Sequence, residues 1–252
     1  MRPPQASFAY VGLSILMTAS LGGAARAEPK AAAPVVGVVE LFTSQGCSSC
    51  PPADKLLKTY VDRPDVIGLT LPVDYWDYLG WKDTLSSPRN TQRQRDYAVT
   101  RGDGAVYTPQ VVVNGRMHVV GSKQSEIDRA INKLKGQYPF TVPVRMATDG
   151  DALVINIGSA KDGNSVSDAT VWLAVVQKKG EVEVGRGENS GRKLTYFNVV
   201  REMSAVGIWN GQAEEIRLSR KSVLWRQTER CVALVQKGAG GPILGAAQWP
   251  EN

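Results

Sequence analysis

The stretch ELFTSQGCSSCPPAD, residues 40–54, carries most of the information about how this chain folds. It contains two cysteines three positions apart, Cys47 and Cys50, followed at once by two prolines. Proline is tolerated in the first turn of a helix, where backbone N–H groups lack helical partners. Residues 53–61 then continue with apolar side chains at helical spacing. The pattern predicts a helix that begins just after the second cysteine.

A Cys-x-x-Cys pair at a helix start has a direct chemical use. The unpaired N–H groups and the positive end of the helix dipole favour a thiolate, which is the nucleophilic form of cysteine. We therefore expect Cys47 to attack a disulfide and Cys50 to resolve the mixed disulfide. A structural zinc site needs about four nitrogen or sulfur ligands. Beyond the pair the chain offers only Cys231 and His118, in distant segments, so no metal or cofactor is predicted.

An acidic residue precedes the pair in an otherwise apolar run. Residues 35–42 are apolar apart from Gly37 and Glu40, which is typical of a central strand buried on both faces. Burial raises the pKa of a carboxyl group, so Glu40 is a candidate proton relay for Cys50. The alternative is an acid held in a salt bridge or exposed at a sheet edge, and the sequence leaves both interpretations open.

Thr108-Pro109 stands before another apolar stretch, and Asn114-Gly115 then marks a two-residue hairpin turn. A proline in this position can take the cis form. The bend would present an open backbone edge to an incoming peptide beside the cysteines. Thr108 and Pro109 are therefore candidate substrate-binding residues, and a plain turn before a strand is the alternative.

An aromatic segment at residues 72–89 includes Trp76 and follows the second apolar strand. Ligands bind at the carboxyl ends of strands in open α/β sheets, which makes Trp76 a candidate wall of a substrate groove. The alternative is a packed loop that covers the sheet. A polar loop at residues 187–192 likewise suits either anion or partner binding or a plain turn.

The order of elements predicts two domains. Residues 34–136 alternate strands and helices and close with a hairpin and an amphipathic helix, which indicates an α/β domain with helices on both faces of its sheet. Residues 139–250 contain short apolar runs separated by turn residues, which indicates a mainly antiparallel, sandwich-like β domain. Cys231 lies in one of these runs and is expected to be a core residue.

Residues 1–27 have the features of a secretory signal peptide. Arg2 precedes an apolar segment, and Ala25-Arg26-Ala27 forms a cleavage signal. The apolar segment is too short, and too often interrupted by polar residues and glycine, to make a good membrane span. The alternative is a retained N-terminal anchor. We expect an exported protein, periplasmic or secreted, without a stable membrane span once the leader is removed. Two close cysteines in such a compartment form a disulfide or a redox pair.

The charge of the chain gives no indication of a nucleic-acid partner. The formal charge of +6 falls to +4 when Arg2 and Arg26 leave with the leader. The remaining basic residues are scattered along the sequence instead of gathered in one segment.

The order of these elements over residues 36–134 resembles the thioredoxin superfamily. More closely, three stretches resemble an exported bacterial family of thioredoxin-like proteins of unknown function, including its Gly-Cys-Ser-Ser-Cys-Pro-Pro motif. The stretches are LFTSQGCSSCPPAD at residues 41–54, VDYWDYLGW at residues 73–81 and YTPQ at residues 107–110. The resemblance implies an α/β thioredoxin-like fold and roles for Cys47, Cys50 and Pro109, and it suggests one for Glu40.

The sequence also departs from thioredoxin around the cysteines. Gly46 stands where thioredoxin has an aromatic residue, and Ser48-Ser49 replaces its Gly-Pro pair. Glu40 is longer than the aspartate of thioredoxin and displaced by one position. The redox potential and the preferred partner therefore do not carry over from that superfamily.

Together these features predict a thiol–disulfide oxidoreductase that acts on protein or small-molecule disulfides after export. One alternative is a copper-binding metallochaperone, because two thiolates suit Cu(I) and Met117-His118 follows Pro109 on the hairpin. Another is a secreted binding module in which the disulfide between Cys47 and Cys50 is only structural.

Overall fold

Strand β1 (Gly37–Thr43) lies inside the large sheet of the computed structural model, and all of its residues are buried. The structure describes residues 1, 34–160, 168–224 and 229–250. β1 pairs in parallel with β2 (Val66–Pro72) and antiparallel with β3 (Gln110–Val113). The prediction of a central strand buried on both faces is confirmed.

The expected signal peptide, residues 1–27, lies outside the described residues except for Met1. In the described ranges, no helix has the length and apolar character needed to cross a membrane. Residues Ala32–Asn252 belong to one compact unit.

Helices cover both faces of the first half of the sheet. Val39 and Leu41 pack with residues of α1 (Pro51–Val61) and α3 (Gln124–Gln137). Val38 and Phe42 point the other way and pack with a residue of α2 (Pro88–Arg101). Successive residues of a strand face opposite sides of a sheet, so the position of each β1 residue determines which helix it meets.

Strands β3 and β4 (Met117–Val120) form the predicted hairpin. Asn114 and Gly115 both have positive φ, 51° and 65°, and the Arg116 N–H donates to the Val113 carbonyl at 2.9 Å. Asparagine and glycine tolerate this left-handed backbone conformation, which a tight hairpin turn requires.

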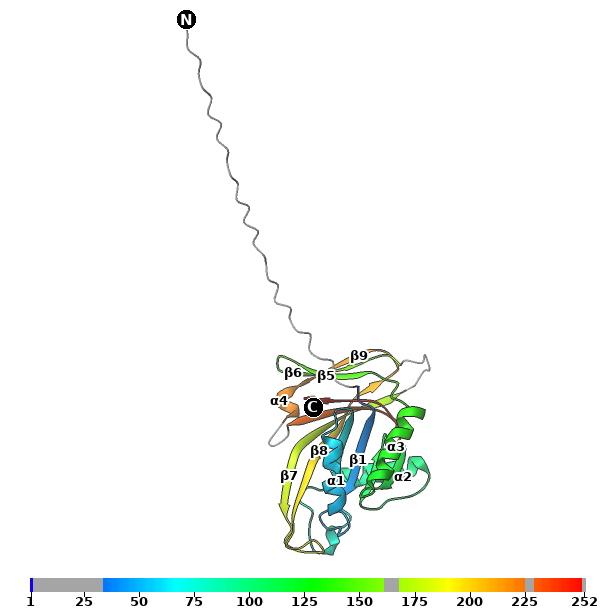
Figure 1. Cartoon of the computed structure of the whole chain (residues 1–252), viewed down its shortest axis with the longest axis vertical. Helices are drawn as coiled ribbons and strands as arrows, with labels where there is room; N and C mark the ends of the chain where they lie inside the picture. The colour runs from blue at the N-terminus through cyan, green and yellow to red at the C-terminus, as the bar shows by residue number, and fades with distance from the viewer. Residues whose placement is uncertain (2–33, 161–167, 225–228, 251–252) are drawn as a thin grey trace. The chain divides into compact units, whose positions relative to one another are not determined.

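The second half of the chain continues the same sheet. β8 (Lys193–Trp209) pairs in parallel with β2, and β7 (Ala169–Glu183), β10 (Arg230–Lys237) and β11 (Ile243–Trp249) follow antiparallel (Figure 1). The strand order is β11-β10-β7-β8-β2-β1-β3-β4. β8 thereby pairs with a β2 edge that would otherwise carry unpaired N–H and C=O groups.

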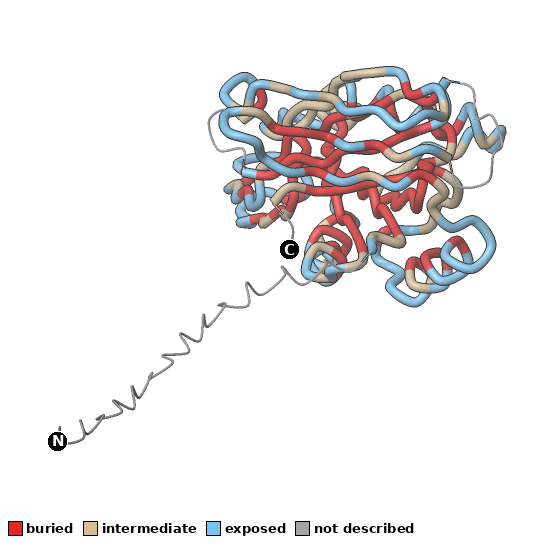
Figure 2. Tube along the Cα trace, turned by 90° about the horizontal axis from the view of Figure 1, so that it is seen from above, coloured by how far each residue is buried: buried red, intermediate tan, exposed pale blue. Residues whose placement is uncertain are grey.

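A second, smaller sheet packs against this extension. It contains β5 (Val144–Asp149), β6 (Ala152–Ile157) and β9 (Glu214–Ser219), and the short helix α4 (Arg220–Val223) follows it. Leu153 and Ile155 of β6 share a core with Val171 and Leu173 of β7. Buried residues concentrate on the strands, and exposed ones gather at the loops and the outer strands (Figure 2).

The predicted boundary at residues 136–139 does not separate two compact units, because Ala32–Asn252 is one unit. The antiparallel pairing expected after it is present, and two sheets do pack together. One of those sheets is the continuation of the sheet that β1 begins. The reason is that β8 pairs with the edge of β2 that β1 leaves open, and sequence periodicity does not reveal such a pairing.

Candidate functional site

Cys47 and Cys50 are joined by a disulfide, with their Cα atoms 5.4 Å apart. Helix α1 begins at Pro51, and Cys50 is its N-cap residue. The Cys50 carbonyl accepts the Ala53 N–H at 2.8 Å and the Asp54 N–H at 3.1 Å. The pair thus lies at the helix start, as its position before two prolines predicted.

The disulfide is covered by its own loop. Cys47 is 4% exposed and Cys50 is fully buried, whereas Ser48 and Ser49 between them are exposed. The Sγ atom of Cys47 lies 3.5 Å from the Ser49 hydroxyl. The two serines are therefore the part of this loop that a partner meets first.

The loop that carries Pro109 packs beside the first turn of α1. The Thr108–Pro109 peptide bond is cis. The Gly121 N–H donates to the Pro109 carbonyl at 2.9 Å. A Cβ atom on Gly121 would lie 3.1 Å from the Pro109 Cβ and 3.2 Å from the Ala53 Cβ. Glycine at this position lets the proline loop lie next to the residues that follow the disulfide.

Trp76 connects this loop to the cysteine loop. Its indole Nε1 donates to the Thr108 hydroxyl at 2.8 Å. On its other side, a Cβ on Gly46 would lie only 3.0 Å from the Trp76 Cβ, so the tryptophan lies against the residue before Cys47. The three candidate substrate-binding residues are therefore neighbours. Trp76 belongs to the aromatic segment that contains the 3₁₀ turn η1 (Asp77–Leu79).

Glu40 lies on the other face of the sheet. Its carboxylate accepts hydrogen bonds from Arg93 Nε at 2.6 Å, from Arg93 Nη2 at 3.2 Å and from the Tyr97 hydroxyl. Both partners belong to α2, while α1 covers the face to which Val39 and Leu41 point. Of the two interpretations, the structure shows the salt bridge, and it separates Glu40 from Cys50 by the thickness of the sheet.

A second buried acid, Asp54, lies in the first turn of α1 and was not predicted from the sequence. It is 3% exposed, and its Oδ1 accepts the Thr43 hydroxyl at 2.7 Å. Its other oxygen is buried and makes no hydrogen bond to any described residue. Burial raises the pKa of Asp54 to about 8, and the nearby Asp83 contributes in the same direction. The available signal was an acid in the first turn of a helix whose other residues on that side are apolar.

Asp83 and Trp81 hold the loop that leads into Cys47. Asp83 Oδ2 accepts the Gln45 N–H at 2.8 Å, and Trp81 Nε1 donates to Gln45 Oε1 at 2.8 Å. Burial raises the pKa of Asp83 to about 6. The aromatic segment therefore packs against the site as well as lining it at Trp76.

The loop between β7 and β8 reaches the same place. Asn189 is fully buried, and its Nδ2 donates to the carbonyls of both Gln45 and Cys47 at 2.9 Å. Arg192 orients this amide by donating to Asn189 Oδ1 at 3.0 Å. The neighbouring Glu188 carboxylate accepts the Ser48 N–H at 3.1 Å. The polar loop at residues 187–192 thus contacts the cysteine loop, which its composition alone did not indicate.

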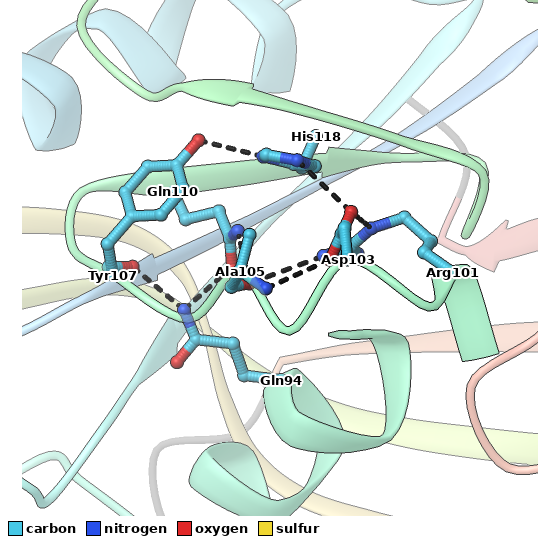
Figure 3. Close-up of polar contacts among 7 residues, drawn as sticks. All are labelled: Gln94, Arg101, Asp103, Ala105, Tyr107, Gln110 and His118. Atoms are coloured by element: carbon cyan, nitrogen blue, oxygen red, sulfur yellow. Dashed lines mark hydrogen bonds and ion pairs between the residues drawn. The ribbon is translucent and has the colours of Figure 1, made fainter. Parts of the chain in front are cut away.

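His118 belongs to a hydrogen-bonded framework beneath the proline loop. It lies between the Tyr107 hydroxyl, 2.9 Å from Nδ1, and Asp103 Oδ2, 3.3 Å from Nε2 (Figure 3). Burial and Arg101 lower the pKa of His118, and hydrogen bonds from Arg101 lower the pKa of Asp103 to about 2. Gln94 donates to the Tyr107 carbonyl at 2.8 Å. The network holds the segment that leads to Thr108.

The third cysteine, Cys231, is not part of the redox pair. Cys231 is free and fully buried in β10, as expected of a core residue, and burial raises the pKa of its thiol to about 12. Within the described ranges, no group of three or more His, Cys, Asp or Glu residues is arranged to hold a metal ion.

Comparisons with known proteins give a family and two structural likenesses. An X-ray crystal structure of a protein from Agrobacterium tumefaciens is 37% identical, with a TM-score of 0.76, over 87% of this chain and 96% of that one. HBP35 of Porphyromonas gingivalis is 16% identical, with a TM-score of 0.59, over 85% of this chain and 74% of that one, a likeness of fold alone. No curated protein matches the chain. The model of the family described as "Protein of unknown function (DUF1223)" matches residues 38–236, and the chain belongs to that family.

Proposed function

We propose that the protein is a thioredoxin-like thiol–disulfide oxidoreductase whose redox couple is Cys47 and Cys50. The observation that carries this proposal is the position of the disulfide. It lies at the start of α1 and beside the cis Thr108–Pro109 loop, and Trp76 touches the loops on both sides. A helix start stabilises a thiolate, and the half-buried Thr108 before the cis bond offers a backbone with which an extended peptide can pair.

The exchange needs no cofactor. In the reducing direction, the Cys47 thiolate attacks a substrate disulfide, a Cys47–substrate bond forms, and one substrate sulfur leaves as a thiolate that takes up a proton. Cys50 then loses its proton and attacks the Cys47 sulfur, which forms the Cys47–Cys50 disulfide and releases the second substrate thiolate. Two electrons pass from the protein dithiol to the substrate. The reverse sequence oxidises a substrate dithiol.

Asp54 is the group best suited to take the Cys50 proton. The two residues are four positions apart at the start of one helix, where such side chains are neighbours on one face. The pKa of Asp54, raised to about 8 by burial, is close to the usual pKa of a thiol, roughly 8.5. Asp54 takes the role that the sequence had suggested for Glu40.

The substrates are protein or small-molecule disulfides, and the compartment is outside the cytoplasm. A stable disulfide suits an oxidising compartment, and residues 1–27 have the composition of an export signal. The half-buried Trp76 and Thr108 would contact the substrate beside Cys47, and the buried Pro109 would position Thr108.

The test is the reduction potential of the Cys47–Cys50 couple. The purified protein is equilibrated in glutathione buffers, and its thiols are trapped and counted by mass. A potential between roughly −120 and −270 mV would support an exchange catalyst, and one below about −300 mV would contradict it. Cys231→Ala is the matched control and should leave the potential unchanged, because Cys231 is buried and free in β10.

A structural disulfide in a binding module is the second candidate. The observation that favours it is the small exposure of the pair, 4% for Cys47 and none for Cys50. A potential below about −300 mV would select this candidate. The copper alternative has no comparable support, because His118 is held by Tyr107 and Asp103.

A further inference from the structure

A groove runs between α2 and the strands β7 and β8, on the face of the sheet that α1 does not cover. Its larger part is a cavity of about 430 Å³ whose lining includes Arg89, Asn90, Arg93, Trp172 and Met203. A second cavity of about 340 Å³ shares Arg89, Asn90 and Met203 with the first, so the two lie side by side. We call this the α2–β8 groove. Its volume is in the range of small-molecule sites.

The groove exists because β8 diverges from the first half of the sheet. β8 pairs with β2 at one position, Thr70 with Val199, and the strand then continues beyond this contact to Trp209. Met203 lies on that continuing part, and Trp172 of β7 pairs with Ala205 two positions further along β8. Both Met203 and Trp172 are only half-buried.

One end of the groove is cationic. Arg201 lines it, and the Nη1 atom of Arg201 is buried without a hydrogen bond to any described residue. Arg89 lies at the same end and is exposed. The acid Glu202 also lines this end and accepts a hydrogen bond from the Ser204 hydroxyl at 2.9 Å, so the end carries two arginines and one carboxylate. A buried guanidinium N–H without a partner is costly, and the two arginines that line this end are the groups with which an anion in the groove would pair.

The other end is largely apolar. Trp172 and Met203 border it together with the small residues Ala205 and Ala239. The indole Nε1 of Trp172 is also buried and has no partner among the described residues. Arg93 contributes little free charge here, because Glu40 neutralises it at 2.6 Å. Asp96 accepts a hydrogen bond from Gln92 at 2.8 Å.

We propose that the α2–β8 groove binds a small organic anion that carries one carboxylate on a flat apolar body. The carboxylate pairs with Arg201 and Arg89, and the body lies against Trp172 and Met203. Guanidinium groups bind carboxylates in a planar, two-bond geometry. The site is independent of the redox couple, because α2 and α1 cover opposite faces of the sheet.

The test compares an acid with its neutral twin. Naphthalene-2-carboxylate and naphthalene-2-carboxamide are titrated into the oxidised protein by calorimetry. The acid should bind with a dissociation constant below ~1 mM and about tenfold more tightly than the amide, which is the effect of one charge-assisted hydrogen bond. Equal affinity for the two, or no saturable binding of the acid, would overturn the proposal. This comparison uses the unaltered chain and needs no variant.

Substitutions then locate the site. Arg201→Gln and Arg89→Gln should each reduce affinity for the acid by about tenfold and leave affinity for the amide unchanged. Arg95→Gln is the matched control, because Arg95 is an exposed arginine of α2 that does not line the groove. If the acid bound both variants with the same affinity as it binds the unaltered protein, the proposed location of the site would be wrong. The reduction potential is not involved, so this proposal and the proposed function fail separately.

Discussion

At the scale of single residues, Asp54 is a carboxyl group that the fold keeps away from water. Asp83 raises its pKa further, and the pKa of Tyr196 is raised by burial and, in addition, by both acids. An acid that the fold prefers to keep protonated lowers stability wherever the unfolded chain would ionise it. The proposed exchange gives this proton site a role, because Cys50 must lose a proton before it attacks Cys47.

Asp54→Asn should stabilise the oxidised protein near neutral pH. The pKa of Asp54 is about 8 in the fold and 3.8 in its ordinary state. The stabilisation from its protonated form is complete below pH ~4 and is lost as the pH rises through about 8. We expect the variant to gain roughly 2–4 kcal/mol in the free energy of unfolding at pH 7, and little at pH 4, in urea titrations. Resolution of a mixed disulfide should become slower.

Asp62→Asn is the control for that substitution. Asp62 ends the same helix and is exposed, where it pairs with Lys58. Its replacement should change stability by less than ~1 kcal/mol at any pH. If Asp54→Asn and the unaltered protein lost stability equally between pH 4 and 8, Asp54 would not be the buried acid that we describe.

Glu188→Gln tests how the β7–β8 loop influences the redox couple. The Glu188 carboxylate accepts the Ser48 N–H, so its charge opposes a thiolate on the neighbouring Cys47. Glutamine keeps an acceptor oxygen and removes the charge. The reduced form should gain stability, and the equilibrium with glutathione should shift toward it about threefold to tenfold, or ~15–30 mV toward a more oxidising potential.

Salt and a neighbouring acid provide the controls for Glu188. Because Glu188 is exposed, the shift should shrink at high ionic strength. Glu183 lies on the same hairpin and is also exposed. Glu183→Gln should therefore leave the reduction potential unchanged. If the reduction potential of the Glu188→Gln variant equalled that of the unaltered protein, the loop would support the site by packing alone and not by its charge.

At the scale of elements, the site depends on how closely β4, α1 and the proline loop approach one another at Gly121. A methyl group there would lie 2.7 Å from Leu41 Cδ1 and close to the Cβ atoms of Pro109 and Ala53. Gly121→Ala should therefore cost about 1–3 kcal/mol of stability and displace Pro109 from the disulfide. Denaturation curves and the rate of Cys47 exchange would both change.

Gly136→Ala is the matched substitution in α3. Nothing lies within 4 Å of a Cβ at Gly136. Alanine restricts the unfolded chain and favours a helix, so a gain of about 0.5–1 kcal/mol is expected. The opposite signs of the two glycine substitutions distinguish close packing from a general effect of adding a methyl group. A neutral Gly121→Ala would mean that the three elements have room to move apart.

At the scale of the whole molecule, local patterns predicted local features. The prolines after Cys50 predicted the start of α1, and Asn114-Gly115 predicted the turn, because both depend on backbone preferences of adjacent residues. The contact of Asn189 with Cys47 spans 142 positions, and the pairing of β8 with β2 spans more than a hundred. Such contacts depend on which edges and carbonyls the fold leaves unpaired, and hydrophobic spacing does not encode them.

The two halves of the chain also share one core, which makes their separate folding unfavourable. Phe42 and Ile67 from the first half pack in one cluster with Val232 and Ile243 from the second. The Arg93 side chain bridges them as well, since its Nη1 donates to Gln236 at 2.9 Å. Removing the second half would expose the β2 edge and this apolar surface together.

We therefore expect one cooperative unfolding transition for the whole protein and no stable fold for residues 34–137 alone. Circular dichroism and tryptophan fluorescence should give coincident urea curves for the full chain, as all-or-none unfolding requires. The isolated segment should bind hydrophobic dyes and unfold without a clear midpoint, because the core that it shares with β10 and β11 is missing. A segment that unfolded cooperatively, with the reduction potential of the full chain, would restore a boundary at residues 136–139. The contacts from Asn189 and Glu188 would then be dispensable for the redox couple.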